Sequence, residues 1–318
     1  MARTYRPLDG VLLFDKPLEL SSNIALQKVR RLFQAEKAGH TGTLDPLATG
    51  LLPICFGEAT KFSNALLDAD KSYRATVRLG QTTATGDAEG EVLVSREVSS
   101  TLDQVHAVLA QFRGPIQQLP PMYSALKHQG KPLYEYIRNG ETVHRELRDV
   151  VIHELVLHRF SDNELDISVR CSKGTYIRTL GEDIGAALGC GAHLTALRRT
   201  AIAHFDLQAG YTLAQLTEMS EPERIACLLP VDSLLPDMPK LQLDEVQIKR
   251  MAQGQRLGLD TGLSDGRVSL YGPQGFVGVG QLQGRRLAPE RLLSCVARQA
   301  AITVIPENLG LSINSIQG

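Results

Sequence analysis

The segment from Lys71 to Gly80 constrains the fold more than any other part of this chain, because apolar and polar residues alternate along it without a break. Its apolar positions are Tyr73, Ala75, Val77 and Leu79. A period of two predicts a β-strand that buries one face in the core of the protein. Tyr73 is then expected on the core face of a sheet, at the end of the strand nearest a cleft.

Other segments predict both strands and helices around this strand. The apolar segments 150–160 and 165–171 are separated by the polar turn 161–164, which predicts a strand pair, and another strand is expected at 194–200. Helical spacing of apolar residues after a cap predicts helices following 21–23 and at 101–112. We also expect helices at about 58–67 and from 173–178 to about 188.

The segment Gly39–Gly50 places one carboxylate, Asp45, in a glycine-rich loop without hydrophobic periodicity. Glycine allows tight turns and close approach of the backbone to a ligand. Pro46 biases Asp45 away from helical angles, and His40 lies five residues before it. We interpret the loop as a candidate catalytic segment, although an ordinary Asp-Pro turn with an Asx hydrogen bond has the same composition.

Several classes of enzyme are disfavoured by motifs that this sequence lacks. It contains no GxxxxGK[ST] loop for nucleotide phosphates, no HExxH zinc motif and no GxSxG nucleophile elbow. Its five cysteines do not fall at zinc-binding spacing. Gly278-Val-Gly280 lies in a late β region where no helix is expected, so it fails as a dinucleotide fingerprint. These absences favour a reaction without metal or cofactor, or no reaction at all.

The composition and the positions of prolines and glycines predict a globular chain of two domains. The 318 residues are 43% hydrophobic and 22% charged, which is ordinary for a globular protein. No apolar run reaches the length of a membrane span, and the run at 11–14 is too short for a signal peptide, so we expect a cytoplasmic protein. A group of prolines at 230–239 marks a change in composition, which indicates a domain boundary. We expect a larger domain at 1–235, a glycine-rich, barrel-like β domain at 240–300 and a tail at 301–318.

The segment 114–140 differs in character from its surroundings. It contains several prolines, and it interleaves basic with aromatic residues: Tyr123, Lys127, His128, Lys131, Tyr134, Tyr136 and Arg138. Cations that contact a phosphate backbone, next to rings that stack on bases, suit a surface that binds nucleic acid. Because the net charge is only −1, any basic face must come from such local asymmetry. An ordinary exposed loop is the alternative interpretation.

Several segments in the same order resemble the bacterial tRNA pseudouridine synthase B (TruB) family. They are Gly10–Pro17, Gly39–Gly50, the strand 71–79 with Tyr73, Lys173–Arg178, Leu197-Arg198-Arg199, and Met122–Lys127, which resembles the RNA-gripping insertion of that family. The resemblance covers roughly residues 10–235, with a looser likeness at the C-terminus to a small RNA-binding domain of PUA type. It implies an α+β fold, in which a mixed, largely antiparallel sheet is flanked by helices around a cleft.

The resemblance also implies an activity, the isomerisation of uridine 55 in the T loop of tRNA to pseudouridine, without metal or redox cofactor. An enzyme that remakes a glycosidic bond must flip the base out of its stack, which costs a few kcal/mol. The expected substrate is therefore the T stem-loop of tRNA. The insertion at about 114–146 would grip this RNA. We expect a monomer with no obligatory protein partner and no membrane association.

Site residues follow from the positions that match the family motifs. Asp45 looks like the nucleophilic carboxylate, which attacks either the sugar or the uracil ring. Arg178 would pair with Asp45 and favour its ionised form. Tyr73 would stack on the target base, and it is also a weak candidate for moving the C5 proton. Two residues would line the uracil pocket and one would contact RNA where the nucleotide leaves the stack: Tyr176, Leu197 and His40, respectively.

Two other functions remain open on sequence alone. The first is an RNA-binding folding aid that opens and refolds the tRNA elbow, which the segment 114–140 and the C-terminal domain favour. The second is a relative that acts on ribosomal RNA under a guide RNA and partner proteins, against which the intact bacterial-type insertion and the short tail argue. Activity of the purified protein on a bare T-arm stem-loop distinguishes the guided enzyme from the unguided one.

Overall fold

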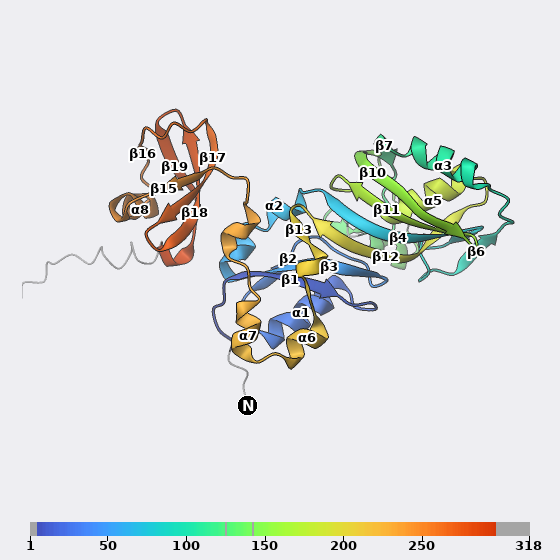
Figure 1. Cartoon of the computed structure of the whole chain (residues 1–318), viewed down its shortest axis with the longest axis horizontal. Coiled ribbons are helices and arrows are strands. Elements are labelled where there is room, and N and C mark those ends of the chain that lie inside the picture. The colour runs from blue at the N-terminus through green and yellow to red at the C-terminus, as the bar shows by residue number, and fades with distance from the viewer. Residues whose placement is uncertain (1–4, 125, 142, 297–318) are drawn as a thin grey trace, which may run out of the picture. The chain divides into compact units, whose positions relative to one another are not determined.

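The computed structural model describes residues 5–124, 126–141 and 143–296. The chain separates into two compact units, Met1–Pro230 and Val231–Gly318 (Figure 1). This division falls within a few residues of the boundary expected near 235. The expected tail at 301–318 lies outside the described residues.

A ten-stranded sheet forms the centre of the larger unit. Along its main path the strands are β14 (Tyr211–Thr212), β1 (Gly10–Lys16), β3 (Ala48–Phe56), β12 (Ala192–Ile202), β4 (Lys71–Leu79), β11 (Glu164–Cys171), β10 (Arg148–Ser161) and β7 (Gly114–Gln118). Two short strands pair off this path, β2 (Ala38–His40) with β3 and β13 (Phe205–Asp206) with β12. All pairings in the sheet are antiparallel except β1 with β14 and β3 with β12. The expected mixed, largely antiparallel sheet is confirmed.

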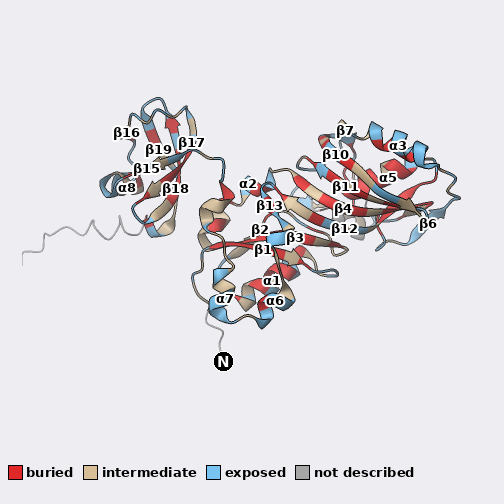
Figure 2. Cartoon of the chain, viewed as in Figure 1, coloured by how far each residue is buried: buried red, intermediate tan, exposed pale blue. Residues whose placement is uncertain are grey.

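The burial of the strands follows the sequence pattern. In β4 buried and half-buried residues alternate along the whole strand, as its period of two predicts. Strand β3 is instead buried at almost every position, which fits a strand covered on both faces (Figure 2). Gly50 of β3 has φ +99°, and a Cβ there would lie 2.3 Å from the carbonyl oxygen of Arg199 on β12. Only glycine therefore lets these two strands pair so closely at this position.

Helices of the larger unit pack on the sheet and complete one hydrophobic core. They are α1 (Ser22–Leu32), α2 (Asn64–Leu67), α3 (Leu102–Gln111), α4 (Leu133–Arg138), α5 (Ile177–Ala187), α6 (Leu213–Glu218) and α7 (Glu221–Ala226), with 3₁₀ turns η1 (Gly57–Lys61) and η2 (Leu207–Ala209). Side chains of α1, α3, α5 and α6 join the same core cluster as the strands. Ser21 caps α1, and Thr101 caps α3 in a capping box, as the sequence predicts.

The helix expected at about 58–67 is instead a 3₁₀ turn followed by the single-turn helix α2. The hydroxyls of Thr60 and Ser63 donate to the carbonyls of Gly57 and Thr60, each three residues earlier. Such local side-chain bonds compete with the hydrogen bonds of a continuous α-helix. The prediction of one helix over about 58–67 is therefore wrong, because only 64–67 is α-helical.

The segment 114–146 has more regular structure than its prolines suggest. It begins with β7, which joins the main sheet at the edge of β10, and continues with the hairpin β8 (Lys127–His128) and β9 (Lys131–Pro132) and then with α4. A second hairpin of the unit consists of β5 (Gln81–Thr83) and β6 (Val92–Ser95). The start of the insertion is therefore anchored to the same sheet that carries Tyr73.

The smaller unit contains a five-stranded sheet in the order β15 (Lys240–Gln242), β17 (Gly266–Gly272), β18 (Gly275–Gln283), β19 (Arg286–Leu292) and β16 (Leu257–Gly258). It also contains the 3₁₀ turn η3 (Val231–Leu234) and the helix α8 (Glu245–Ala252). The β-rich character is confirmed, whereas α8 was missed. Its signal in the sequence was the capping box between Asp244 and Gln247.

Candidate active site

A cavity of about 280 Å³ lies in the larger unit, where the loop after β2, the strands β4 and β12, and the start of α5 meet. This volume is close to that of a small-ligand pocket, about 300 Å³ or more. Five of the six expected site residues line it: Asp45, Tyr73, Tyr176, Arg178 and Leu197. The sixth, His40, lies on β2 outside the lining, and burial lowers the pKa of its imidazole.

The loop that carries Asp45 is held by side chains from outside it. Ser22, the first residue of α1, accepts from the Leu44 N–H at 2.7 Å and donates to the Leu44 carbonyl at 2.9 Å. The fully buried ammonium of Lys16 donates to the carbonyls of Pro17 and Leu20, at 2.9 and 2.6 Å, and lies 3.5 Å from that of Pro46. Burial lowers the pKa of Lys16 to about 8. These bonds fix the backbone on both sides of Asp45.

Replacing Ser22 by alanine is expected to lower the free energy of unfolding by about 1–3 kcal/mol, because the buried N–H and C=O of Leu44 then lose their partner. The change removes one buried oxygen, so little repacking accompanies it. Urea unfolding measures the effect, with Ser99→Ala at an exposed position as the control. Equal unfolding midpoints and slopes for the two variants would contradict the role of Ser22.

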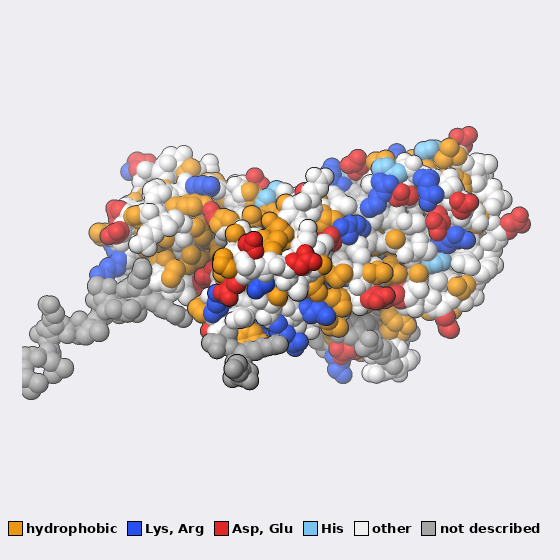
Figure 3. All heavy atoms as spheres, turned by 60° about the horizontal axis from the view of Figure 1, so that its bottom comes forward, with side chains coloured by type: hydrophobic (Ala, Val, Ile, Leu, Met, Phe, Trp, Pro, Cys, Tyr) orange, Lys and Arg blue, Asp and Glu red, His pale blue; other side chains and the backbone are white. Residues whose placement is uncertain are grey.

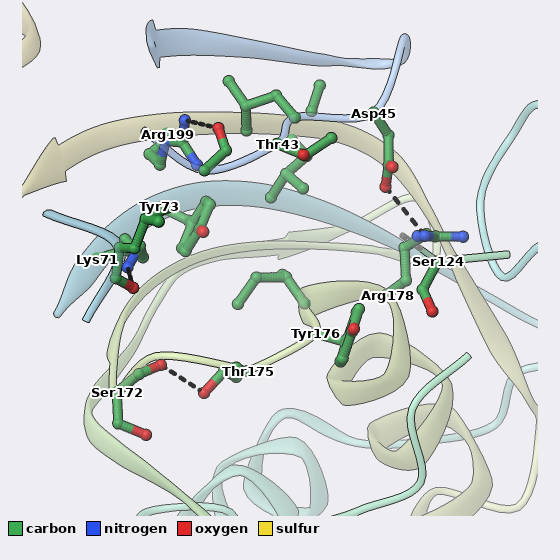
Figure 4. Close-up of a pocket in the computed structure, with 17 residues that line it drawn as sticks. Thr43, Asp45, Lys71, Tyr73, Ser124, Ser172, Thr175, Tyr176, Arg178 and Arg199 are labelled. Carbon is green, nitrogen blue, oxygen red and sulfur yellow. Dashed lines mark hydrogen bonds and ion pairs between the residues drawn. The ribbon is translucent and has the colours of Figure 1, made fainter. Parts of the chain in front are cut away.

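Arg178 lies between two carboxylates. Its Nη2 atom is 3.0 Å from Oδ2 of Asp45 (Figure 4). Its Nε atom is 3.7 Å from Oδ2 of Asp87. The guanidinium also donates to the carbonyls of Thr85 and Tyr123, at 3.0 and 2.5 Å. Arg178 and Asp87 are almost fully buried, whereas 39% of the Asp45 side chain is exposed, and Asp45 lines the cavity. In the Asp45–Arg178 pair, the carboxylate is therefore accessible from the cavity and the guanidinium is buried in the protein.

Burial raises the pKa of the Asp45 carboxyl, and Arg178 opposes that rise. The neighbouring carboxylate of Asp87 raises the pKa of Asp45 further, and Lys16 lowers it. The expected pairing is therefore present, but Arg178 reduces a pKa rise rather than holding the pKa of Asp45 below its ordinary value. The balance of these influences leaves the pKa of the partly exposed Asp45 carboxyl above its ordinary value.

Tyr73 is buried at the wall of the cavity beside Arg199 of β12. Arg199 is 1% exposed, and it donates to the carbonyls of Leu51 and Gly42 at 2.7 and 3.3 Å. The charge of its guanidinium also acts on the Tyr73 hydroxyl and lowers the pKa of that group. Burial raises the pKa of the Tyr73 hydroxyl, an effect that Arg199 only partly opposes. A phenol in this state keeps its proton at neutral pH, which favours a stacking surface over a base.

Three residues of the site were given no role on sequence alone: Lys71, Asp87 and Arg199. Lys71 closes the end of α2 by donating to the carbonyls of Leu66, Leu67 and Ala69, at 3.2, 2.9 and 2.6 Å. Two of them had a signal in the sequence: Arg199 belongs to the Leu-Arg-Arg motif, and Lys71 is the first residue of the alternating strand. Asp87 had no local signal, because its position beside Arg178 depends on the tertiary fold.

On the face in Figure 3, Lys and Arg side chains are interspersed with Asp and Glu side chains. Within the described ranges, no three His, Cys, Asp or Glu side chains are placed to hold a metal ion. The helices in those ranges include none long and apolar enough to cross a membrane. The cavity therefore combines an accessible carboxylate, a cation paired with it and an aromatic wall.

Protein-family models match the chain over most of its length. Residues 30–177 match the N-terminal domain of the TruB family pseudouridylate synthases. Residues 178–236 match the tRNA pseudouridylate synthase B C-terminal domain, and residues 239–293 match a model for the C-terminal part of pseudouridine synthase II TruB.

Curated relatives agree with these models. The chain is 55% identical over 294 residues to a protein of Methylobacillus flagellatus named tRNA pseudouridine synthase B, a match that covers 92% of this chain and 97% of the relative. It is 56% identical over 293 residues to a protein of the same name from Chromobacterium violaceum, covering 91% and 96% of the two chains.

Solved structures share the fold. A Cbf5-Nop10-Gar1 complex matches with a TM-score of 0.68 and 25% identity, covering 89% of this chain and 84% of the other. A Nop10-Cbf5 complex of the archaeal box H/ACA sRNP matches with a TM-score of 0.66 and 23% identity, covering 92% and 86%. The expected pseudouridine synthase fold is thereby confirmed.

Proposed function

Because this chain belongs to the TruB family, RNA pseudouridine synthases that isomerise uridine to pseudouridine in tRNA, we propose that its target is uridine 55 of the T loop and that Asp45 is the nucleophile. We further propose that it acts in the cytoplasm as a monomer without an obligatory protein partner, and without metal or redox cofactor.

The observation that best supports Asp45 as the nucleophile is its ion pair with Arg178 in the wall of the cavity. Of the two carboxylates beside Arg178, Asp45 is the one that reaches the cavity. The other, Asp87, is 3% exposed and does not line the cavity. A flipped base that enters this cavity meets the carboxylate and the aromatic wall together. Arg178 stabilises the ionised carboxylate before attack and holds it in place. Base flipping costs a few kcal/mol, which stacking on an aromatic ring of the enzyme offsets.

The remaining site residues have supporting roles in this proposal. Tyr73 stacks on the target base, and Tyr176 and Leu197 line the uracil pocket, in agreement with their places around the cavity. His40 lies outside the lining, which suits contact with RNA beside the flipped nucleotide rather than with the base itself.

The direct test is a mass assay on unmodified tRNA transcript after cyanoethylation, which tags pseudouridine. Wild-type protein alone is expected to create one tagged site, at position 55. A bare T-arm stem-loop is expected to be modified as well, because the proposed enzyme needs no guide RNA or partner protein. Tight tRNA binding without a tagged site would overturn the proposal.

Affinity for tRNA is expected to depend strongly on salt. Each phosphate that a Lys or Arg neutralises releases counterions, so several contacts together reduce the association constant steeply as salt rises. We expect the dissociation constant to increase at least about tenfold between about 50 mM and about 200 mM salt. Filter binding at constant pH measures the slope, and a flat response would argue against backbone contacts.

A second role, as a tRNA folding aid, is favoured by the anchored insertion. Strand β7 joins the insertion to the main sheet, while Lys127 and His128 lie further along it. Removing the segment 117–138 is expected to weaken tRNA binding. A catalytically inactive variant that still accelerates refolding of a tRNA transcript would separate this role from the chemistry.

A further inference from the structure

The start of the insertion contacts the start of α5 at two points. The side chain of Gln118, the last residue of β7, bonds to the backbone of Tyr176. The carbonyl of Tyr123 accepts from Nη2 of Arg178 at 2.5 Å. Tyr176 and Arg178 both line the cavity, so two residues of the site are held by the segment that leads into the insertion.

Gln118 forms a two-bond clamp on Tyr176. The Tyr176 N–H donates to Oε1 of Gln118 at 3.0 Å, and Nε2 of Gln118 donates to the Tyr176 carbonyl at 3.3 Å. A backbone N–H can only donate, so it requires the amide oxygen on its side and leaves the NH₂ group for the carbonyl. Gln118 is 2% exposed, so water does not readily replace either bond.

The clamp acts at the junction between the cavity wall and α5. Tyr176 is the N-cap of α5, and in this described part of the chain it makes no side-chain capping bond. The residues before it, 172–175, run along the cavity, and Gly174 has φ +81°. Gln118 binds this junction from outside the segment. Its amide oxygen is the acceptor for the Tyr176 N–H, and its NH₂ group shares the Tyr176 carbonyl with the N–H of Leu180.

We propose that Gln118 is a positioning residue that sets Tyr176 and the first turn of α5 for the reaction and thereby connects the RNA-gripping insertion to the active site. This inference rests on the proposed function. Gln118 does not line the cavity, so it acts through Tyr176 and, by fixing the same helix start, through Arg178. RNA that binds the insertion then meets a site whose geometry depends on the insertion's own first strand.

The first test replaces Gln118 by leucine, which fills similar space without hydrogen bonds. The single-turnover rate of pseudouridine formation on a T-arm stem-loop is expected to fall about tenfold or more, because Tyr176 is misplaced. The dissociation constant for the same RNA is expected to stay within about twofold, since contacts of Lys and Arg side chains with the phosphate backbone dominate affinity and are unchanged. Gln111→Leu, the same change at an exposed position of α3, is the control and should match wild type in both.

The second test replaces Gln118 by glutamate, which keeps size and shape. An ionised carboxylate accepts from the Tyr176 N–H but has no proton for the Tyr176 carbonyl, whereas a protonated carboxyl supplies both bonds. Burial raises the pKa of such a carboxyl. The ratio of variant to wild-type rate is therefore expected to rise as the pH falls from about 8 to about 5.5. Titration of Asp45 is common to both proteins and cancels in the ratio.

The outcomes are distinguishable. A wild-type rate in the leucine variant, or equal losses in rate and affinity, would overturn the positioning role. If the leucine variant fails to fold, the glutamate variant decides: a rising ratio supports the proposal and a flat ratio rejects it. Wild-type protein that leaves the T-arm unmodified would instead contradict the proposed function.

Discussion

Asp45→Asn is expected to lower pseudouridine formation by on the order of 10³-fold or more, while the dissociation constant for tRNA stays near that of wild type. The amide keeps the size and shape of the carboxylate, but it is not a nucleophile. The neighbouring Arg178 loses its accessible counter-charge but keeps its contacts with Asp87 and with two backbone carbonyls. The fold and the RNA-binding surface are therefore expected to persist.

Single-turnover assays with the cyanoethylation readout and filter binding measure the two quantities on the same preparation. Asp166→Asn is a matched control, because Asp166 also pairs with an arginine, Arg74, but lies on β11 away from the cavity lining. Turnover at the wild-type rate in Asp45→Asn would remove Asp45 from the proposed chemistry. A large loss of affinity would indicate that Asp45 mainly organises the RNA-binding surface.

Arg178→Met is expected to lower the rate by about 10²-fold or more and to move the acid limb of the pH–rate profile upward by about 1–3 pH units. The reaction requires the Asp45 carboxylate, and Arg178 is the cation that most lowers its pKa. Without that cation burial and Asp87 still raise the pKa, so a higher pH is needed to ionise Asp45. The loss of rate relative to wild type is therefore expected to be greatest at low pH and smaller at high pH.

Arg178→Lys keeps a positive charge but loses the planar fork, so it is expected to restore part of the pH shift and less of the rate. Arg78→Met on β4 is the control, since Arg78 is 39% exposed and pairs with Glu164 at 3.4 Å. Thermal melting of each variant is needed, because Asp87 loses a buried partner in Arg178→Met. An unchanged acid limb in a folded Arg178→Met protein would show that Asp45 ionisation does not limit the reaction.

Much of the fold was predictable from short segments of sequence. The alternation in β4, the capping box before α3 and the polar turn between β10 and β11 are local signals, and each element lies where its signal placed it. The predictions were wrong where single local hydrogen bonds set the secondary structure. Such bonds produce the 3₁₀ turn before α2, and a capping box that was overlooked begins the helix α8. Boundaries and short helices depend on such single bonds, which hydrophobic spacing does not contain.

The candidates for chemistry were recognisable in contiguous patterns, a glycine-rich loop with Asp45 and an alternating strand with Tyr73. Their surroundings depend on how distant segments pack against them. Gln118 and Tyr176 are 58 residues apart in the chain, and Asp87 and Arg178 are separated by a still longer stretch of sequence, so no local spacing indicates either contact. Sheet pairing sets these neighbours, because the register of β4, β12 and β7 brings distant segments to one cavity. The shifts in the pKa of Lys16, Asp45 and Tyr73 follow from that burial and from the charges it brings near.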